Sequence, residues 1–187
     1  MMDPVVEARC RAANGAVERA RRALSSSTGL VEALRELQAA LASMPDRPAS
    51  DEERTLRDEL YRLLRLVDWR LVEPEWRAAA GGVAMLRYPD DAGGTQTVEL
   101  HTLGRAIVVG RSVDAGVSLA RKDVHREHLR IEVSQGAIWL KNLGHMDTKV
   151  NGSPIDDAPV RLVGGEDIEI GGAHLLFQVT SAKAGDD

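Results

Sequence analysis

The first part of the chain carries apolar residues at helical spacing. Six apolar or small side chains alternate steps of four and three, which places all of them on one helix face: Val6, Cys10, Ala13, Val17, Ala20 and Leu24. A second stripe runs from Leu30 to Leu41, between a Ser-rich break and Pro45. A third opens at Ser50 and Glu53, which have capping-box spacing, and is expected to end at Pro74. Three helices are predicted, the first two as a hairpin.

After Gly81 and Gly82 the pattern changes to short apolar runs separated by turn residues. Nine strands are expected, at residues 83–88, 97–103, 106–109, 117–119, 129–133, 137–140, 160–163, 167–170 and 174–179. Turn chemistry separates several of them, as at Asn151 and Gly152. Many short strands at close spacing predict a β-sandwich or barrel, most simply an antiparallel meander.

The two patterns predict an α+β chain in two parts. Residues 1–80 form an all-α helical bundle or coiled-coil-like region, residues 81–180 an all-β sandwich, and residues 181–187 a disordered tail. A Gly-containing linker at residues 78–82 joins the two parts. The helical stripes leave two readings open: a bundle within one chain, which we favour, or a seam that forms a homodimer.

Composition narrows the class of protein. The net charge is -5, and residues 1–79 hold 13 Arg against 14 Asp and Glu, so no surplus of cations predicts nucleic-acid binding. Only 3% of the residues are aromatic, and Trp69, Trp76, Trp139 and Phe177 are expected as the large pieces of an aliphatic core. The single Cys10 is compatible with a reducing compartment. No apolar run predicts a signal peptide or membrane insertion, so the expected location is cytoplasmic.

Four groups of residues stand in a specific order on the predicted strands. Gly110 and Arg111 end a Val-rich strand, and residues 124–128 read Val-His-Arg-Glu-His. Residues 142–144 read Asn-Leu-Gly and lead to Val150, Asn151 and Gly152, and residues 165–171 read Gly-Glu-Asp-Ile-Glu-Ile-Gly. In this order and spacing the last hundred residues resemble the forkhead-associated (FHA) domain family. The resemblance implies an FHA-like β-sandwich that binds phosphothreonine in extended peptides and performs no catalysis.

The resemblance assigns roles to individual residues. It implies that Arg111 holds the phosphate and that Arg126 keeps the Arg of the family's Ser-Arg-x-His motif, with Arg121 and Lys122 adding positive charge. His125 stands at the Ser of that motif, while Met146 and Asp147, after His145, stand where the family has hydroxyl and Asn side chains. The resemblance implies structural support from Gly110, His128, Asn151 and Gly152. The phosphopeptide motif is therefore degenerate.

Three functions follow from these residues. In the first, the chain is an adaptor that binds a Thr-phosphorylated partner through Arg111, and protonated His125 donates to the phosphate, so binding strengthens below about pH 6.5. In the second, a degenerate FHA scaffold docks a protein partner without phosphate, in a bacterial signalling or secretion assembly. The third is a metal or catalytic site at His125, His145 and Asp147. We disfavour it because His125 and His128, which are three apart along a strand entrance, point to opposite faces and would not chelate one ion. We therefore expect no enzyme, metal or cofactor.

Overall fold

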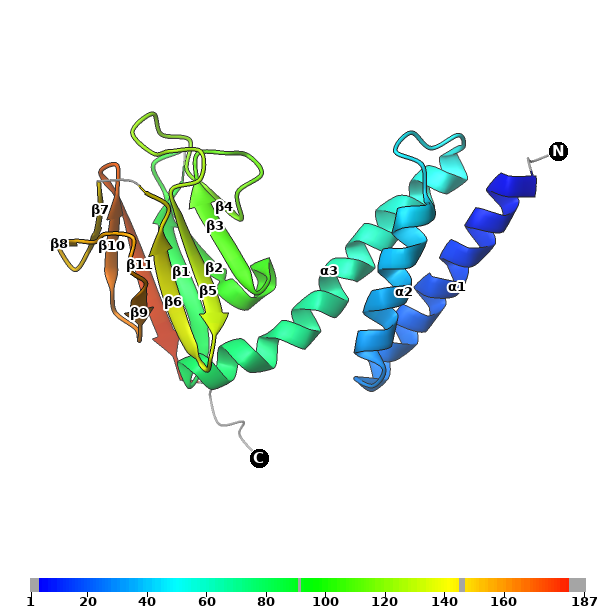
Figure 1. Cartoon of the computed structure of the whole chain (residues 1–187), viewed down its shortest axis with the longest axis horizontal. Coiled ribbons are helices and arrows are strands. Elements are labelled where there is room, and N and C mark those ends of the chain that lie inside the picture. The colour runs from blue at the N-terminus through cyan, green and yellow to red at the C-terminus, as the bar shows by residue number, and fades with distance from the viewer. Residues whose placement is uncertain (1–3, 91, 145–146, 182–187) are drawn as a thin grey trace. The chain divides into compact units, whose positions relative to one another are not determined.

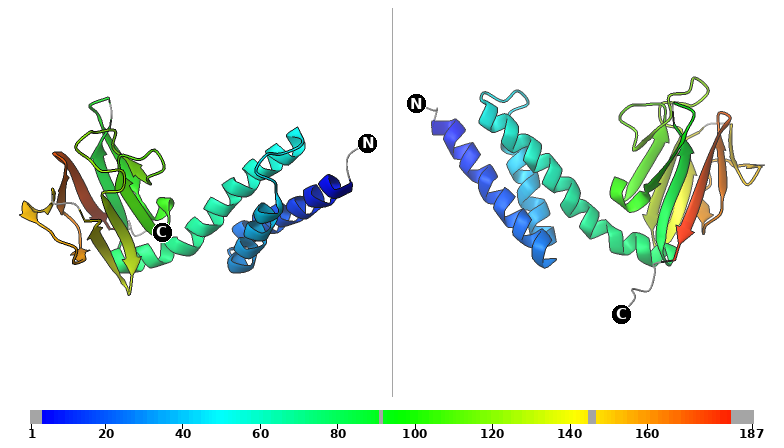
Figure 2. Two further views of the ribbon diagram at one scale, coloured as in Figure 1. Left: turned by 45° about the horizontal axis from the view of Figure 1, so that its top comes forward. Right: turned by 180° about the vertical axis from the view of Figure 1, so that it is seen from behind.

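The structure is a computed structural model that describes residues 4–90, 92–144 and 147–181 (Figure 1). It divides into two compact units between Leu71 and Val72. The first unit is helical. The second unit holds the β-sandwich together with the last turns of the third helix (Figure 2).

Three helices form the first unit, as the sequence predicts. Helix α1 spans Pro4–Ser26, α2 spans Leu30–Ser43 and α3 spans Asp51–Ala80. The apolar stripes meet in one core, which includes Ala13, Val17, Ala20, Leu37, Leu60, Leu63 and Val67. Small Ala side chains on α1 let α2 pack closely against it, which gives the expected hairpin.

The start of α3 is fixed by the predicted capping box. The backbone N–H of Glu53 donates to Ser50 Oγ at 3.1 Å, and the Glu53 carboxylate accepts from the backbone N–H of Ala49 at 2.8 Å. That carboxylate is fully buried and pairs with Arg9 of α1 at 2.8 Å. A buried charge is tolerated only when it is paired and hydrogen-bonded, and Glu53 satisfies both conditions.

The predicted end of α3 at Pro74 is wrong. The helix continues through Pro74 to Ala80, although an interior proline removes one hydrogen bond and crowds the preceding turn. Val72 and Trp76 lie on this continuation, and both are buried in the core of the sandwich. The burial of these two side chains offsets the cost of Pro74.

The expected Gly-containing linker is also wrong. The helix runs to Ala80, and Gly81 follows it with a φ of 68°, the left-handed conformation that favours glycine after a helix. A Cβ on Gly82 would lie 2.3 Å from the carbonyl oxygen of Thr180, so the chain passes directly against the last strand. The helix and the first strand are therefore joined by a tight turn.

The sandwich contains eleven strands and one short 3₁₀ helix in the residues that the structure describes. The strands are β1 Val83–Pro89, β2 Thr95–Glu99, β3 Ala106–Gly110, β4 Val117–Ser118, β5 Leu129–Ser134, β6 Ala137–Asn142, β7 Thr148–Val150, β8 Ser153–Pro154, β9 Val160–Leu162, β10 Asp167–Ile170 and β11 Ala173–Thr180. One sheet has the order β2-β1-β11-β10-β7-β8, and the other has the order β4-β3-β5-β6-β9. The core between them includes Leu86, Val109, Ile131, Leu140, Ile168 and Phe177, all fully buried.

The topology is not the simple meander that the turns predicted. Strand β1 pairs with β11, so the two ends of the sandwich lie side by side, and β3 pairs with β4 in parallel. Residues 100–103, expected as strand, form the 3₁₀ helix η1 Leu100–Leu103. The short strands β7 and β8 lie beyond the predicted set, because runs of three and two residues are too short for a periodicity signal.

Trp139, which the sequence placed in the core, lies instead on the outer face of the sandwich. Its neighbours Ile138 and Leu140 point into the core, so Trp139 points to the outer face of β6, where it is half-buried. Its indole N–H donates to the carbonyl oxygen of Ser134 at 3.2 Å. None of the helices in the described part of the chain is long and apolar enough to cross a membrane.

Candidate functional site

Three loops meet at one end of the sandwich, after strands β3, β4 and β6 (Figure 1). Backbone hydrogen bonds join the first loop to the second: the N–H of Arg111 donates to the carbonyl of His125 at 2.8 Å, and that of Ser112 to Arg126 at 3.0 Å. The N–H of Leu143 in the third loop donates to the carbonyl of His128 at 3.1 Å. The segment from His125 to His128 is therefore the centre on which the other two loops are fixed.

Gly110 permits this arrangement. A Cβ at this position would lie 2.2 Å from the carbonyl oxygen of Arg126 and 2.9 Å from that of His125. Both distances are shorter than any real Cβ contact, so a side chain would push the second loop away. The absence of a side chain at Gly110 brings Arg111 and Arg126 into neighbouring positions.

The side chains of Arg111 and Arg126 are exposed. Within the described residues neither guanidinium makes an ion pair or a side-chain hydrogen bond. Both therefore keep their donors available to a ligand. Lys122, in the same loop as Arg126, is exposed and unpaired in the same sense.

Arg121 is engaged elsewhere. Its guanidinium donates to both carboxylate oxygens of Asp123, at 3.0 and 2.7 Å, and to the carbonyl of Gly171 at 3.2 Å. These hydrogen bonds raise the pKa of Arg121 and lower the pKa of Asp123. The charge expected from Arg121 is thus balanced by Asp123, and the pair holds the second loop against the β10–β11 turn.

His128 anchors the loops from inside. Its ring is fully buried, and Nδ1 accepts from the backbone N–H of His125 at 3.2 Å. The ring proton is therefore on Nε2, which donates to Thr148 Oγ1 at 3.1 Å. The Thr148 hydroxyl donates to Asn142 Oδ1 at 3.1 Å, so one chain of hydrogen bonds connects the second loop, β7 and β6. This position suits the support role that the resemblance implies.

His125 lies over this network. Its own side chain is exposed, and its ring centroid lies 5.4 Å from that of His128 with the planes at 65°. Asp147, in the third loop immediately before β7, is also exposed. Met146 and His145 lie outside the residues that the structure describes. Among the described residues no group of three or more His, Cys, Asp or Glu is placed to hold a metal ion.

Asn151 and Gly152 lie away from the three loops. They form the turn between β7 and β8 with φ angles of 51° and 78°. The side chain of Asn151 accepts from the backbone N–H of Asp167 at 3.0 Å, and its own N–H donates to the carbonyl of Asp167 at 2.8 Å. They therefore fix β7 to β10, and through β7 they hold Thr148 in place.

The sequence reasoning passed over Ser112. This half-buried residue follows Arg111 directly, and its backbone bond to Arg126 places it between the two arginines. Its hydroxyl accepts from the backbone N–H of Asp114 at 3.4 Å, a long contact that leaves the hydroxyl proton available. The sequence could have pointed to Ser112, because it is a hydroxyl residue that immediately follows Gly110 and Arg111.

Comparison with known proteins agrees with this geometry. Residues 107–171 match the family model of the FHA domain. The matched range runs from β3 through β10 and includes all three loops. None of the curated proteins matches the sequence.

Solved structures similar to this chain are FHA domains of bacteria, yeast and plants. The FHA-1 domain of Rv1747 from Mycobacterium tuberculosis is 27% identical, with a TM-score of 0.42, over 52% of this chain and 95% of that one. The FHA domain of an Arabidopsis thaliana hypothetical protein is 23% identical, with a TM-score of 0.47, over 56% and 92%. The yeast Dun1 FHA domain, solved with a doubly phosphorylated peptide from Rad53, is 22% identical, with a TM-score of 0.45, over 56% and 79%.

Proposed function

We propose that this chain is a non-enzymatic adaptor whose FHA domain binds a threonine-phosphorylated segment of a partner protein. The observation that carries the proposal is the pair Arg111 and Arg126. Both guanidiniums are exposed, both are free of partners among the described residues, and backbone bonds hold them on adjacent loop segments. Two such cations at a loop end suit a phosphate dianion, which accepts from several donors at once.

Each neighbouring residue has a part in this proposal. Arg111 and Arg126 supply the charge, and Ser112 supplies the hydroxyl donor that His125 replaces in the family's motif. His125, whose side chain is exposed beside these residues, offers a ring nitrogen as a further donor to the phosphate. Gly110 and His128 keep the two loop segments at their spacing.

The test is binding of a degenerate phosphothreonine peptide library to the full chain, because Val72 and Trp76 belong to the core of the sandwich. Arg111→Ala should abolish capture of phosphorylated peptides and leave unphosphorylated controls unchanged. Arg87→Ala, which removes an exposed arginine from strand β1, is the matched control and should bind like the wild type. Equal capture of phosphorylated and unphosphorylated peptides at pH 6 and pH 8 would refute phosphate binding.

A second function has its own observation in Asp147. This exposed carboxylate stands at the third loop, where like charge would oppose a phosphate. In this alternative the chain is a scaffold subunit of a cytoplasmic signalling or secretion assembly, and its loops dock a partner without phosphate. A natural partner that is still captured by Arg111→Ala, but lost when the loop residue Leu143 is changed to Asp, would favour this function over the first.

The helices act within one chain in this proposal. Most apolar residues of α1 and α2 in the described part of the chain are buried or partly buried in one core with residues of α3, so their stripes are used within one chain. We therefore expect a monomer. Size-exclusion chromatography with light scattering measures the mass directly, and a dimer that α1 substitutions dissociate would contradict the expectation.

A further inference from the structure

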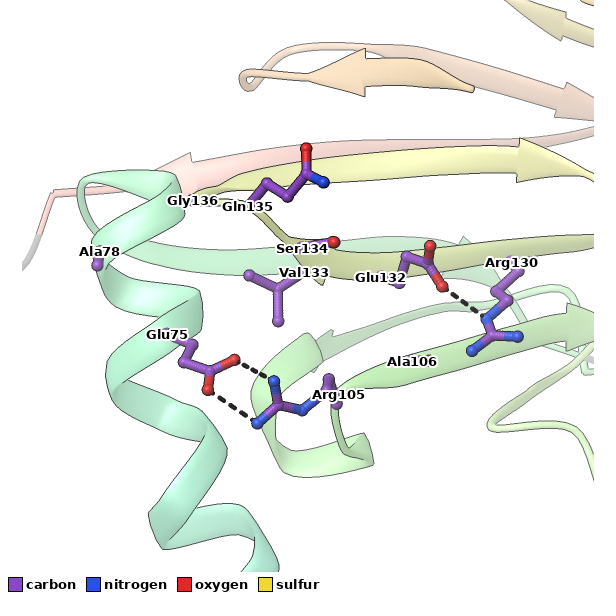
Figure 3. A pocket seen from close by; sticks show the side chains of 10 residues that line it. All are labelled: Glu75, Ala78, Arg105, Ala106, Arg130, Glu132, Val133, Ser134, Gln135 and Gly136. Carbon is purple, nitrogen blue, oxygen red and sulfur yellow. Dashed lines mark hydrogen bonds and ion pairs between the residues drawn. The ribbon is translucent and has the colours of Figure 1, made fainter. Parts of the chain in front are cut away.

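The second unit has a pocket far from the three loops. It has a volume of about 500 Å³ and lies between the last turns of α3 and strands β3 and β5 (Figure 3). Strand β3 runs from this pocket, at Ala106, to the loop end, at Gly110, so the two features occupy opposite ends of the sandwich. Charged side chains line it, with Glu75 paired to Arg105 at 2.7 Å and Glu132 paired to Arg130 at 2.9 Å.

The lining continues across the outer face of the five-stranded sheet. Strand register places Glu132 opposite Trp139, and Trp139 opposite Arg161 on β9. In the neighbouring row Arg130 lies opposite Lys141. Residues two apart on a strand share a face, so these side chains form one surface with the pocket at its edge.

The charges on this surface do not balance. Glu75 is committed to Arg105, and Glu132 is shared between Arg130 at 2.9 Å and Lys141 at 3.4 Å. Arg161 is exposed and, in the part of the chain that the structure describes, has no carboxylate within ion-pair distance. Four cations thus face two carboxylates, on a chain whose overall net charge is -5.

Trp139 gives the surface an apolar centre. It is half-buried, it lies between Glu132 and Arg161, and its bond to Ser134 fixes the indole ring. Half-buried Ala106 and Val108 on β3, the strand on the other side of β5, add further apolar surface. A fixed aromatic ring with cations around it offers contact area at low entropic cost, as in many binding surfaces.

We propose that this surface, formed by Arg105, Arg130, Trp139, Lys141 and Arg161 and called here the basic strip, binds an acidic extended segment of a partner protein. The excess positive charge selects carboxylates, and Trp139 contacts the apolar groups between them. Glu75 and Glu132 lie within the strip and oppose a continuous phosphate backbone, which favours a peptide with spaced carboxylates over a nucleic acid. The basic strip lies on the outer face of the sheet and reaches from the pocket to Arg130 and Lys141, which stand two residues from the loops after β4 and β6. Its proposed ligand does not rest on the phosphothreonine proposal.

The probe is a fluorescein-labelled octapeptide of alternating Glu and Val, titrated into the full chain at low salt. The double variant Lys141→Glu with Arg161→Glu should weaken binding about tenfold or more, because it replaces attraction by like-charge repulsion. Arg35→Glu with Arg65→Glu is the matched control. It makes the same charge change at exposed helix positions and should bind within about twofold of wild type.

A local readout places the peptide. Peptide binding should change the intrinsic tryptophan fluorescence of the wild type, and Trp139→Phe should remove that change. A phosphothreonine peptide should bind the double variant with wild-type affinity, and the acidic peptide should bind Arg111→Ala with wild-type affinity. The two proposed sites are therefore tested independently of each other. Circular dichroism checks that each variant is folded. If the reversed charges unfold the sheet, the double variant Lys141→Gln with Arg161→Gln replaces it in the binding test.

Three outcomes overturn the proposal. Equal weakening by the control pair would show that only the net charge matters. Loss of the acidic peptide with Arg111→Ala would assign it to the loops. Tighter, Trp139-dependent binding of an oligothymidylate of the same charge would make the partner a nucleic acid.

Discussion

The indole N–H of Trp76 donates to the carbonyl oxygen of Gly104 at 3.0 Å. Trp76 is on α3 and fully buried, while Gly104 follows η1 and precedes β3. This bond joins the helix to the start of the strand that ends at Arg111. The helix terminus is therefore part of the framework that carries the candidate site.

Trp76→Phe should lower the free energy of unfolding of the sandwich by about 1–2 kcal/mol, because it deletes the donor to the carbonyl of half-buried Gly104. Trp76→Ala should cost about 3–5 kcal/mol, since it also opens a cavity. Urea denaturation measures both. Trp139→Phe, on the outer face, is the control and should cost less than either.

Gly110→Ala should destabilise the sandwich by about 2 kcal/mol and weaken phosphopeptide binding, because the new Cβ would overlap the carbonyl of Arg126. Gly136→Ala is the control that separates the effect of steric overlap of the Cβ from the effect of backbone strain. Gly136 has a φ of 70° but nothing within 4 Å of a Cβ, so it should cost about 1 kcal/mol and leave binding intact. Thermal melts and peptide titrations test the pair, and equal effects on binding would refute the role given to Gly110.

Thr148→Val should cost about 1–3 kcal/mol, although the two side chains have nearly the same shape. The substitution removes the acceptor for His128 Nε2 and the donor to Asn142 Oδ1, all in a buried network. Thr97→Val, on the exposed face of β2, should be close to neutral. A loss of less than about 0.5 kcal/mol for Thr148→Val in chemical denaturation would mean that the network does little to hold the loops.

The first unit should lose stability in acid through Glu59. Hydrogen bonds from Arg62, with further support from Arg21, lower the pKa of Glu59 from 4.5 to about 2. A carboxyl with a lowered pKa in the folded state stabilises the fold fully above its unfolded pKa. That contribution should fade as the pH falls from 4.5 toward 2.

The check is denaturation of Glu59→Gln between pH 7 and pH 2. The variant should be less stable at neutral pH, by about 1 kcal/mol for partly exposed ion pairs, and its stability should fall less steeply in acid. Glu32→Gln, at an exposed position in α2, should follow the wild-type curve. Parallel curves for Glu59→Gln and wild type would contradict the assignment.

The sequence predicted most of the fold because its periodicities are local. The stripes of α1 and α2 gave those helices, and short apolar runs between turn residues gave strands such as β5 and β10. It failed at Pro74, where burial of Trp76 in the distant sandwich outweighs the local cost of proline. Such a contact leaves no trace in local spacing.

The candidate site residues came from the resemblance to the FHA family and not from periodicity. The sequence singled out Arg111, Arg126 and His128, and the structure brings their loops together. It could not show that Asp123 would hold Arg121, or that Ser112 would lie beside Arg126, because both depend on how separate loops meet. It also placed Trp139 in the core, since a tryptophan in a strand gives no sign of which face it occupies.

Helix α3 belongs to both units without a break. For gene recombination, the boundary of the sandwich therefore falls inside the helix and not in the turn before the first strand. A gene fusion or recombination at Gly81 would deliver the strands without Val72 and Trp76, and the transplanted domain would begin with a hole in its core. A recombination that moves this sandwich keeps its core complete only if it also carries the last turns of α3, from Val72 onward.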